Sequence, residues 1–262
     1  MTDQLSLRLR ADLPNLPAGL LPMLARPLAE PFDSTDHLFE PCWGGRRALA
    51  LVGPAAVAGA GTVKFTGEAG EAIRTLPELA GLAVRLEARS AVLDGELVVV
   101  DAAGRADAAE LDRRLAGAPG RPVAYLASDL LHVDGRSLLG WPLTRRRELL
   151  RRLLHAGDEV VAVPAIQGEG RALHAAVVAQ GLAGVTARLR TSPYLPGIRS
   201  RLWRFVPAEV AGAVVPGAGA VVPGAGAAEG DALQPPAGGE PTEAASAPVL
   251  ALISRLPLDL GE

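Results

Sequence analysis

A tandem repeat near the carboxyl end limits how much of this chain can form a folded domain. Ala-Val-Val-Pro-Gly-Ala-Gly occurs at residues 213–219 and again at 220–226. Proline interrupts backbone pairing, and glycine raises the chain entropy that ordering must overcome, about 1–2 kcal/mol per residue. We therefore divide the chain into an N-terminal extension over residues 1–19, a folded domain over residues 20–207, and a low-complexity, disordered tail over residues 208–262.

The distribution of charged residues in two segments predicts the cellular location of the chain. Charged residues recur through residues 1–30, and they interrupt any apolar core of a secretory signal. Nineteen uncharged residues separate Glu209 from Glu229, which approaches the length of a membrane span, but proline and glycine favour turns over a helix there. We therefore predict a cytoplasmic protein that makes no contact with a membrane.

Composition narrows how the domain can be stabilised and what it can bind. Aromatic residues make up 3% of the chain and apolar residues 49%, so alanine, valine and leucine must fill the core. The net charge of −3 gives no general attraction for nucleic acid, so any contact with DNA must be local. A single cysteine, Cys42, excludes an internal disulfide and a cysteine-rich metal site.

Apolar runs predict a mixture of strands and helices. Residues 91–100 give the clearest strand, and its continuous apolarity indicates burial on both faces. Further strands are predicted at residues 37–39, 48–52, 123–127, 184–189 and 202–206. Helices are predicted at residues 20–28, 77–87, 144–155 and 168–180.

The helix predicted at residues 144–155 shows an amphipathic pattern. Thr144 is expected to cap its amino end, and its leucines recur on one side. The arginines on the other side are predicted to face solvent, namely Arg145, Arg147, Arg151 and Arg152.

The most informative short motif is Glu-Pro-Cys-Trp-Gly-Gly-Arg-Arg at residues 40–47. It resembles the nucleotidyl-transfer motif of ATP-dependent DNA ligases, Glu-x-Lys-x-Asp-Gly-x-Arg, whose lysine takes AMP from ATP through a phosphoramide bond. Glu40, Gly45 and Arg47 fit the pattern. Cys42 stands at the position of the lysine and Gly44 at that of the aspartate, so the motif lacks its nucleophile.

Other segments resemble the same family in the same order. They are Leu-Asp-Gly-Glu at residues 93–96, the stretch 125–138, Pro-Leu at 142–143 with residues 146–150, Gly-Leu-Ala-Gly-Val at 181–185, and Ser-Pro-Tyr-Leu-Pro-Gly at 192–197 with Trp203. Their order and spacing over residues 20–207 make the chain similar to the adenylation domain of these ligases, in particular to the ligase domain of bacterial end-joining DNA ligases.

The resemblance implies a fold and a set of ligands. The fold would be α+β, of the nucleotidyltransferase, ATP-grasp-like type, with two packed, largely antiparallel sheets and flanking helices. A complete oligonucleotide-binding barrel is not expected, because no series of five strands can be laid over the remaining sequence. The implied ligands are ATP and Mg²⁺, with nucleotide-binding positions at Glu40, Arg47, Glu96 and Arg188 and a metal position at Glu96.

Several positions depart from the family pattern. Ser128 aligns with an adenine-stacking aromatic residue, Ala183 with a metal-associated glutamate, and Phe205 and Pro207 with two phosphate-binding lysines. Arg188 aligns with a lysine, and it keeps the charge without the geometry. Lys64 is the only lysine of the chain, and we interpret it as an exposed strand residue rather than a substitute nucleophile.

Two functions remain open from the sequence. One is an ATP-dependent DNA ligase-like protein of DNA repair and recombination by end joining, with ligase activity lost or severely reduced. The other is a non-catalytic module that binds DNA ends, nucleotide or an end-joining partner on the same scaffold. Six arginines and no acidic residue lie between residues 171 and 207, and they would contact phosphates if they gathered on one face.

Overall fold

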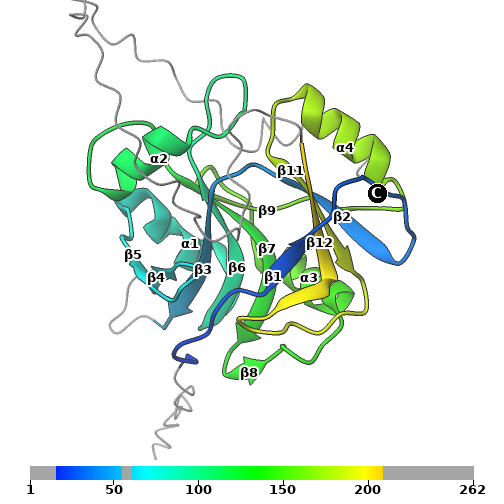
Figure 1. Ribbon diagram of the computed structural model, residues 1–262. Helices are drawn as coiled ribbons and strands as arrows, with labels where there is room; N and C mark the ends of the chain where they lie inside the picture. The colour runs from blue at the N-terminus through cyan, green and yellow to red at the C-terminus, as the bar shows by residue number, and fades with distance from the viewer. Residues whose placement is uncertain (1–15, 55–60, 209–262) are drawn as a thin grey trace, which may run out of the picture.

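Two packed β-sheets form the centre of the protein (Figure 1). The computed structural model describes residues 16–54 and 61–208. The larger sheet contains β3 (Arg46–Gly53), β4 (Thr62–Thr66), β5 (Ala72–Ile73), β6 (Ala91–Val98), β7 (Ala124–Val133), β8 (Arg136–Ser137) and β9 (Val160–Ala162). The smaller sheet contains β1 (Leu24–Pro27), β2 (His37–Cys42), β10 (Ile166–Gln167), β11 (Gly184–Leu189) and β12 (Arg199–Pro207).

The strand order confirms the predicted α+β architecture. The larger sheet runs β5-β4-β3-β6-β7-β8 with β9 beside β7, and the smaller runs β1-β12-β11-β2-β10. Neighbouring strands are antiparallel except for two parallel pairs, β1 with β12 and β7 with β9. The sheets are therefore largely antiparallel.

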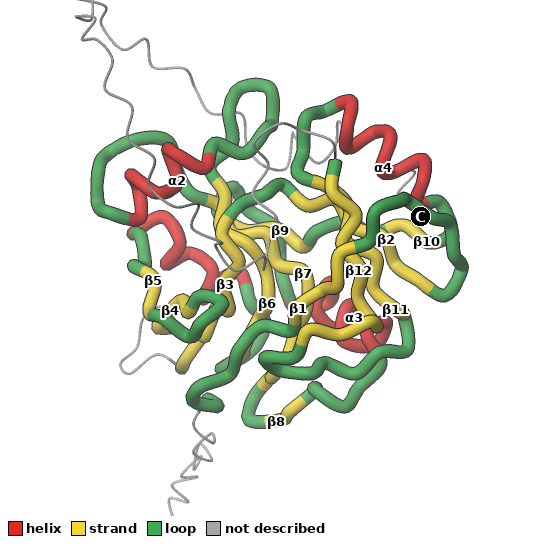
Figure 2. Tube along the Cα trace, viewed as in Figure 1, coloured by secondary structure: helices red, strands yellow, loops and turns green. Residues whose placement is uncertain are grey.

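The helices lie outside the sheets (Figure 2). They are the 3₁₀ helix η1 (Pro77–Gly81), α1 (Leu82–Arg85), α2 (Ala108–Leu115), α3 (Leu143–Leu153) and α4 (Gly170–Ala179). Leu79, Leu82 and Leu150 pack against the outer side of the larger sheet. Leu173 and Val177 of α4 pack against the smaller sheet.

Strand β6 is buried on both of its faces, as its apolar run predicts. Leu93 belongs to the core beneath η1, α1 and α3. Its neighbour Val92 packs instead with Tyr194 and Trp203 between the sheets. Alternation along the strand sends these two side chains to opposite faces, so β6 joins two parts of the core.

The helix predicted at residues 20–28 is wrong. That segment contains β1, which pairs in parallel with β12, and the backbone N–H of Leu24 donates to the carbonyl of Ile198. Pro22 and Pro27 disfavour a continuous helix, and the free edge of β12 supplies partners for an extended chain. Tertiary pairing therefore decides the conformation of this segment.

Thr144 does not cap α3. The helix begins at Leu143, with Pro142 at the N-cap position and no side-chain cap. The first free N–H groups find backbone acceptors instead, because Leu143 donates to the carbonyl of Ser192 and Thr144 to that of Arg190. A distant loop thus satisfies the helix end.

Helix α2 was not predicted from the sequence. Asp107 caps it by accepting a hydrogen bond from the N–H of Glu110. The Asp-x-x-Glu spacing was the available signal, since it is typical of a helix start. The other predicted strands and the helices at 77–87 and 168–180 are confirmed in position, although 77–87 forms a 3₁₀ turn followed by one turn of α-helix.

Some predictions fall outside the described residues. These are the conformation of residues 1–15 and that of the tail beyond residue 208, including the tandem repeat. Within residues 16–54 and 61–208, no helix is long and apolar enough to cross a membrane.

Candidate functional site

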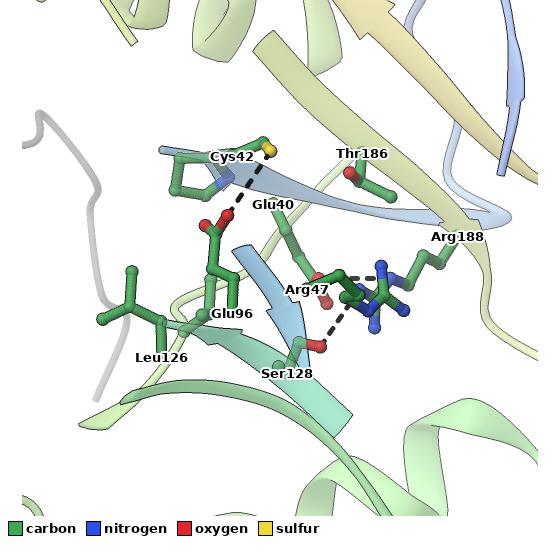
Figure 3. Close-up of a pocket in the computed structure, with 11 residues that line it drawn as sticks. Glu40, Cys42, Arg47, Glu96, Leu126, Ser128, Thr186 and Arg188 are labelled. Atoms are coloured by element: carbon green, nitrogen blue, oxygen red, sulfur yellow. Dashed lines mark hydrogen bonds and ion pairs between the residues drawn. The ribbon is translucent and has the colours of Figure 1, made fainter. Parts of the chain in front are cut away.

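A small cavity of about 40 Å³ lies between the two sheets. Both sheets contribute to its wall (Figure 3). The lining residues are Glu40, Pro41 and Cys42 from β2, Arg47 from β3, Gly95 and Glu96 from β6, Leu126 and Ser128 from β7, Thr186 and Arg188 from β11, and Val163.

Strand register explains why these side chains meet. Residues two apart on a strand share a face, so Glu40 and Cys42 point the same way from β2. Thr186 lies opposite Glu40 on β11. In the other sheet Arg47 lies opposite Glu96. The structure thus brings together all five predicted site residues, including Arg188, although their roles stay predictions.

Glu40 is held by two arginines of this chain. One carboxylate oxygen accepts from Nη1 of Arg147 at 2.5 Å, and the other lies 3.3 Å from Nε of Arg188. All three side chains are nearly fully buried. The carboxylate predicted to meet adenine is therefore already in contact with two internal cations.

Arg147 corrects the prediction that it faces solvent. Besides Glu40, its guanidinium donates to the carbonyls of Ser128 at 2.6 Å and Val163 at 2.5 Å. Burial lowers the pKa of Arg147, the attraction of Glu40 opposes this, and the charge of Arg188 lowers it further. Helical periodicity assigns charged residues to the outside and gives no sign of such a distant partner.

Arg188 extends into the cavity from β11 of the smaller sheet. Its guanidinium lies 4.3 Å from the centre of the Trp203 ring, and Nη2 donates to the hydroxyl of Ser128 at 3.1 Å. Nη1 is buried with no hydrogen-bond partner among the described residues. Ser128, at the position of the family's stacking ring, therefore supports a cation instead of a base.

Glu96 fastens the turn that follows Cys42. Its two oxygens accept from the backbone N–H groups of Trp43 at 3.0 Å and Gly45 at 3.1 Å. Burial raises the pKa of Glu96, although these hydrogen bonds and Arg47 act in the opposite direction. Gly45 has no room for a side chain, since a Cβ there would lie 2.2 Å from the carbonyl of Leu97.

Cys42 is poorly suited to act as a nucleophile. Its side chain is buried, and Sγ lies 3.9 Å from Oε2 of Glu96. Burial raises the pKa of the thiol well above its usual range, and the nearby Glu96 carboxylate raises it further. Because the thiolate is the reactive form, this surrounding keeps Cys42 inert.

Arg47 is also engaged within the protein. Its Nε and Nη2 donate to the two carboxylate oxygens of Asp94, each at 2.6 Å. Burial disfavours the charged guanidinium, but attraction to Asp94 outweighs it, and the pKa of Arg47 is raised. Tyr194 completes the group by donating to Asp94 at 2.9 Å. The predicted contact of Arg47 with ribose or phosphate competes with this pair.

An adenine nucleotide does not fit this arrangement. Ligand pockets usually measure about 300–1,000 Å³, whereas about 40 Å³ holds only a few water molecules. No aromatic ring from the described part of the chain lines the cavity, and Glu40 already faces Arg147 and Arg188. Binding would require these ion pairs to open.

The residues do not form a metal site either. No group of three or more histidine, cysteine, aspartate or glutamate side chains is placed to hold an ion anywhere in the described part of the chain. Glu96 uses both oxygens to accept backbone hydrogen bonds, and Ala183 lies beside Cys42 where the family pattern has a glutamate. Mg²⁺ would lack ligands here.

Lys64 cannot replace the missing nucleophile. It is exposed on β4, where it pairs with Leu51 of β3, and it does not line the cavity. Its interpretation as an exposed strand residue is confirmed. The arginines between 171 and 207 likewise do not share one face, since Arg188 points into the cavity and Arg171 pairs with Asp33 at the surface.

Comparison with known proteins gives a consistent family. The family described as ATP dependent DNA ligase domain matches residues 22–204. The multifunctional non-homologous end joining DNA repair protein LigD of Mycobacterium tuberculosis (strain H37Rv) is 35% identical over 188 residues, covering 71% of this chain and 23% of LigD. The SPbeta prophage-derived DNA ligase-like protein LigB of Bacillus subtilis (strain 168) is 27% identical over 183 residues, covering 70% of this chain and 65% of LigB.

Solved structures agree with this assignment. A mycobacterial DNA ligase D complexed with ATP and MES superimposes with a TM-score of 0.61 at 29% identity, covering 72% of this chain and 60% of that one. The ligase domain of LigD from M. tuberculosis gives a TM-score of 0.59 at 30% identity, covering 71% and 58%. This chain therefore spans under two thirds of each of these relatives, and about a quarter of LigD.

Proposed function

This chain belongs to the ATP-dependent DNA ligase domain family, and from that premise we propose that it is an end-joining ligase-like protein that has lost self-adenylation. The observation that carries the proposal is Cys42 at the position of the nucleophilic lysine. Transfer of AMP needs an unprotonated nucleophile beside the α-phosphate. A buried thiol whose pKa is raised supplies none at neutral pH.

The surroundings of Cys42 support the same proposal. The site in which a base and phosphates would be recognised is filled by an internal ion-pair group. It consists of Glu40 and its partners Arg147 and Arg188. Phe205 and Pro207 replace two lysines that would neutralise phosphates in the family pattern. Losses of groups that act together are not additive, so one restored group would not restore the reaction.

Incubation with α-³²P-labelled ATP and Mg²⁺, followed by denaturing electrophoresis, tests the proposal. We expect no labelled band for the wild-type chain and none for Cys42→Lys. A labelled band that disappears in Cys42→Ala would overturn the proposal. Robust labelling of Cys42→Lys would show that the pocket had kept its function and that only the nucleophile was lost.

A non-catalytic nucleotide-binding role is the second candidate, and the unpartnered Nη1 of buried Arg188 favours it. Without a stacking ring, and with Glu40 engaged, the site offers little to distinguish adenine from other bases. Calorimetry should therefore give weak binding, since a lost stacking contact is worth about 1–3 kcal/mol. ATP and GTP should bind with similar affinities, because Glu40 is paired with two arginines and does not read the edge of the base. Tight adenine-selective binding that is lost in Arg188→Ala would contradict this expectation. No heat with either nucleotide would remove the candidate.

A further inference from the structure

An open groove of about 400 Å³ lies on the smaller sheet and is separate from the cavity between the sheets. Its apolar lining consists of the partly buried side chains of Leu28, Phe32, Leu189 and Leu202. Its polar lining consists of His37, Arg201 and Arg204. None of these residues lines the cavity described above.

Strand register places the groove on the outer face of the smaller sheet. Arg188 of β11 and Trp203 of β12 are paired and point inward. Their neighbours Leu189 and Arg204 therefore point outward. Arg201 and Leu202 lie where the pairing of β12 with β1 shifts its register, and they also line the groove. Leu189 is paired with His37 of β2, which extends the row across three strands.

Helix α4 covers only one part of this outer face. Leu173 and Val177 pack on Phe39, Val185 and Ala187, which lie toward the other end of the strands. Figure 1 shows α4 over one end of this sheet. The groove is the uncovered remainder, and it leaves four large apolar side chains partly open.

The charge of the groove restricts its occupant. No acidic residue lines it, and neither Arg201 nor Arg204 forms an ion pair within residues 16–54 and 61–208. The nearby acid Asp33 is paired with Arg171. Burial lowers the pKa of His37, Asp36 opposes this, and the charge of Arg204 lowers it further, so the positive charge of the groove comes from Arg201 and Arg204. An apolar segment with acidic residues would complement this lining.

The chain itself contains such a segment after its low-complexity region. Residues 249–262 read Val-Leu-Ala-Leu-Ile-Ser-Arg-Leu-Pro-Leu-Asp-Leu-Gly-Glu. They combine a run of large apolar side chains with two acids near the end, Asp259 and Glu262, and one basic residue, Arg255. We propose that residues 249–262 bind in this groove, with leucines on its apolar lining and the acids near Arg201 and Arg204.

The length of the connecting chain permits this contact. Strand β12 ends at Pro207, and the groove lies about four residues back along it, roughly 15 Å at the rise of a strand. Residues 209–248 separate the two in the sequence, and a random-coil chain of that length would span about 35 Å on average. Such a tether gives an effective concentration near ~1 mM, so even an affinity of about 0.1 mM keeps the groove mostly filled.

Trypsin cleavage after Arg255 tests the proposal in the full chain. Arg255 is the only basic residue beyond residue 204, so release of the fragment 256–262 reports on this segment alone. Cleavage of a protected segment follows the fraction that is undocked. We expect Arg201→Glu/Arg204→Glu to release the fragment about tenfold faster than the wild-type chain. The matched control Arg145→Glu/Arg152→Glu, on the exposed side of α3, should leave the rate unchanged.

A second variant leaves the folded domain untouched. Leu258→Asp/Leu260→Asp should release its fragment as fast as the groove variant, once each rate is divided by the rate at which trypsin cleaves a free peptide of the same sequence, residues 249–262 with or without the two substitutions. Equal rates for wild-type and both variants would overturn the proposal. Protection that grows with protein concentration would also overturn it, because the occupant would then be the segment of a second copy.

Discussion

The two faces of the smaller sheet carry arginines in opposite situations. On the inner face, Arg188 and Arg147 of α3 converge on Glu40, and across the cavity Arg47 of the larger sheet is paired with Asp94. On the outer face, Arg201 and Arg204 line an open groove without an ionic partner among the described residues. The inner arginines thus have carboxylate partners within the protein, and the outer arginines remain available to a ligand.

This difference shows that the face that carries the family's motifs is not the face whose charged groups are free to bind a ligand. The inner face contains the residues that align with the nucleotide-binding positions of the family. Their charges are paired and buried, so removing one partner leaves the other as an uncompensated buried charge. The groove of the outer face carries none of the family's motif positions named above, yet Arg201 and Arg204 have no ionic partner there among the described residues. We therefore expect the inner face to be closed and structural and the outer face to be open.

The largest effect is expected from Glu40→Ala. The substitution leaves Arg147 and Arg188 buried with no counter-ion, so the free energy of unfolding should fall by about 3–5 kcal/mol. Urea unfolding measures it, with Glu148→Ala on the exposed side of α3 as the control. A loss below about 1 kcal/mol would mean that water or a ligand, not Glu40, satisfies the arginines.

Alkylation of Cys42 tests closure in a different way. The thiol is buried and its pKa is raised, so reaction with iodoacetamide at pH 8 requires local opening. We expect a rate at least about 100-fold slower than that of the unfolded chain in denaturant. Mass spectrometry follows the modification. Comparable rates would show that the cavity opens readily and that its ion pairs are labile.

The sequence predicted which residues meet at the inner face, but it did not predict their ion-pair partners. Glu40, Cys42, Arg47, Glu96 and Arg188 meet at one cavity because strand alternation and motif order determine their side of each sheet. Arg147 was missed because helical periodicity measures only local amphipathicity, whereas its burial depends on a carboxylate 107 positions away. Strand β1 was missed for the same reason, since its partner β12 is even more distant in sequence, with Leu24 paired to Arg199.

Glu96 should make stability depend on pH in a defined direction. Burial raises its pKa in the folded state above the unfolded value near ~4.3, so between these two values the folded chain holds a proton that the unfolded chain releases. Its contribution to stability therefore falls as pH rises through this window. The difference between wild-type and Glu96→Gln should decrease with pH by at most about 1.4 kcal/mol per unit. A difference that increases would show that the carboxylate is favoured by its two backbone donors over burial.

The smallest effect is expected from substituting the two groove arginines in a shortened chain, which tells whether they stabilise the folded domain itself or only a bound segment. In a chain ending after Pro248, Arg201→Glu/Arg204→Glu should change the free energy of unfolding by no more than about 0.5 kcal/mol, because neither side chain has an ionic partner within residues 16–54 and 61–208. In the full chain, a docked segment populated about tenfold over the free form adds about 1.4 kcal/mol to stability, which the same substitution removes. Thermal or urea unfolding of the four proteins gives this difference directly. An equal change in both chain lengths would place the effect in β12 itself, and the outer face would then be as much a part of the core as the inner one.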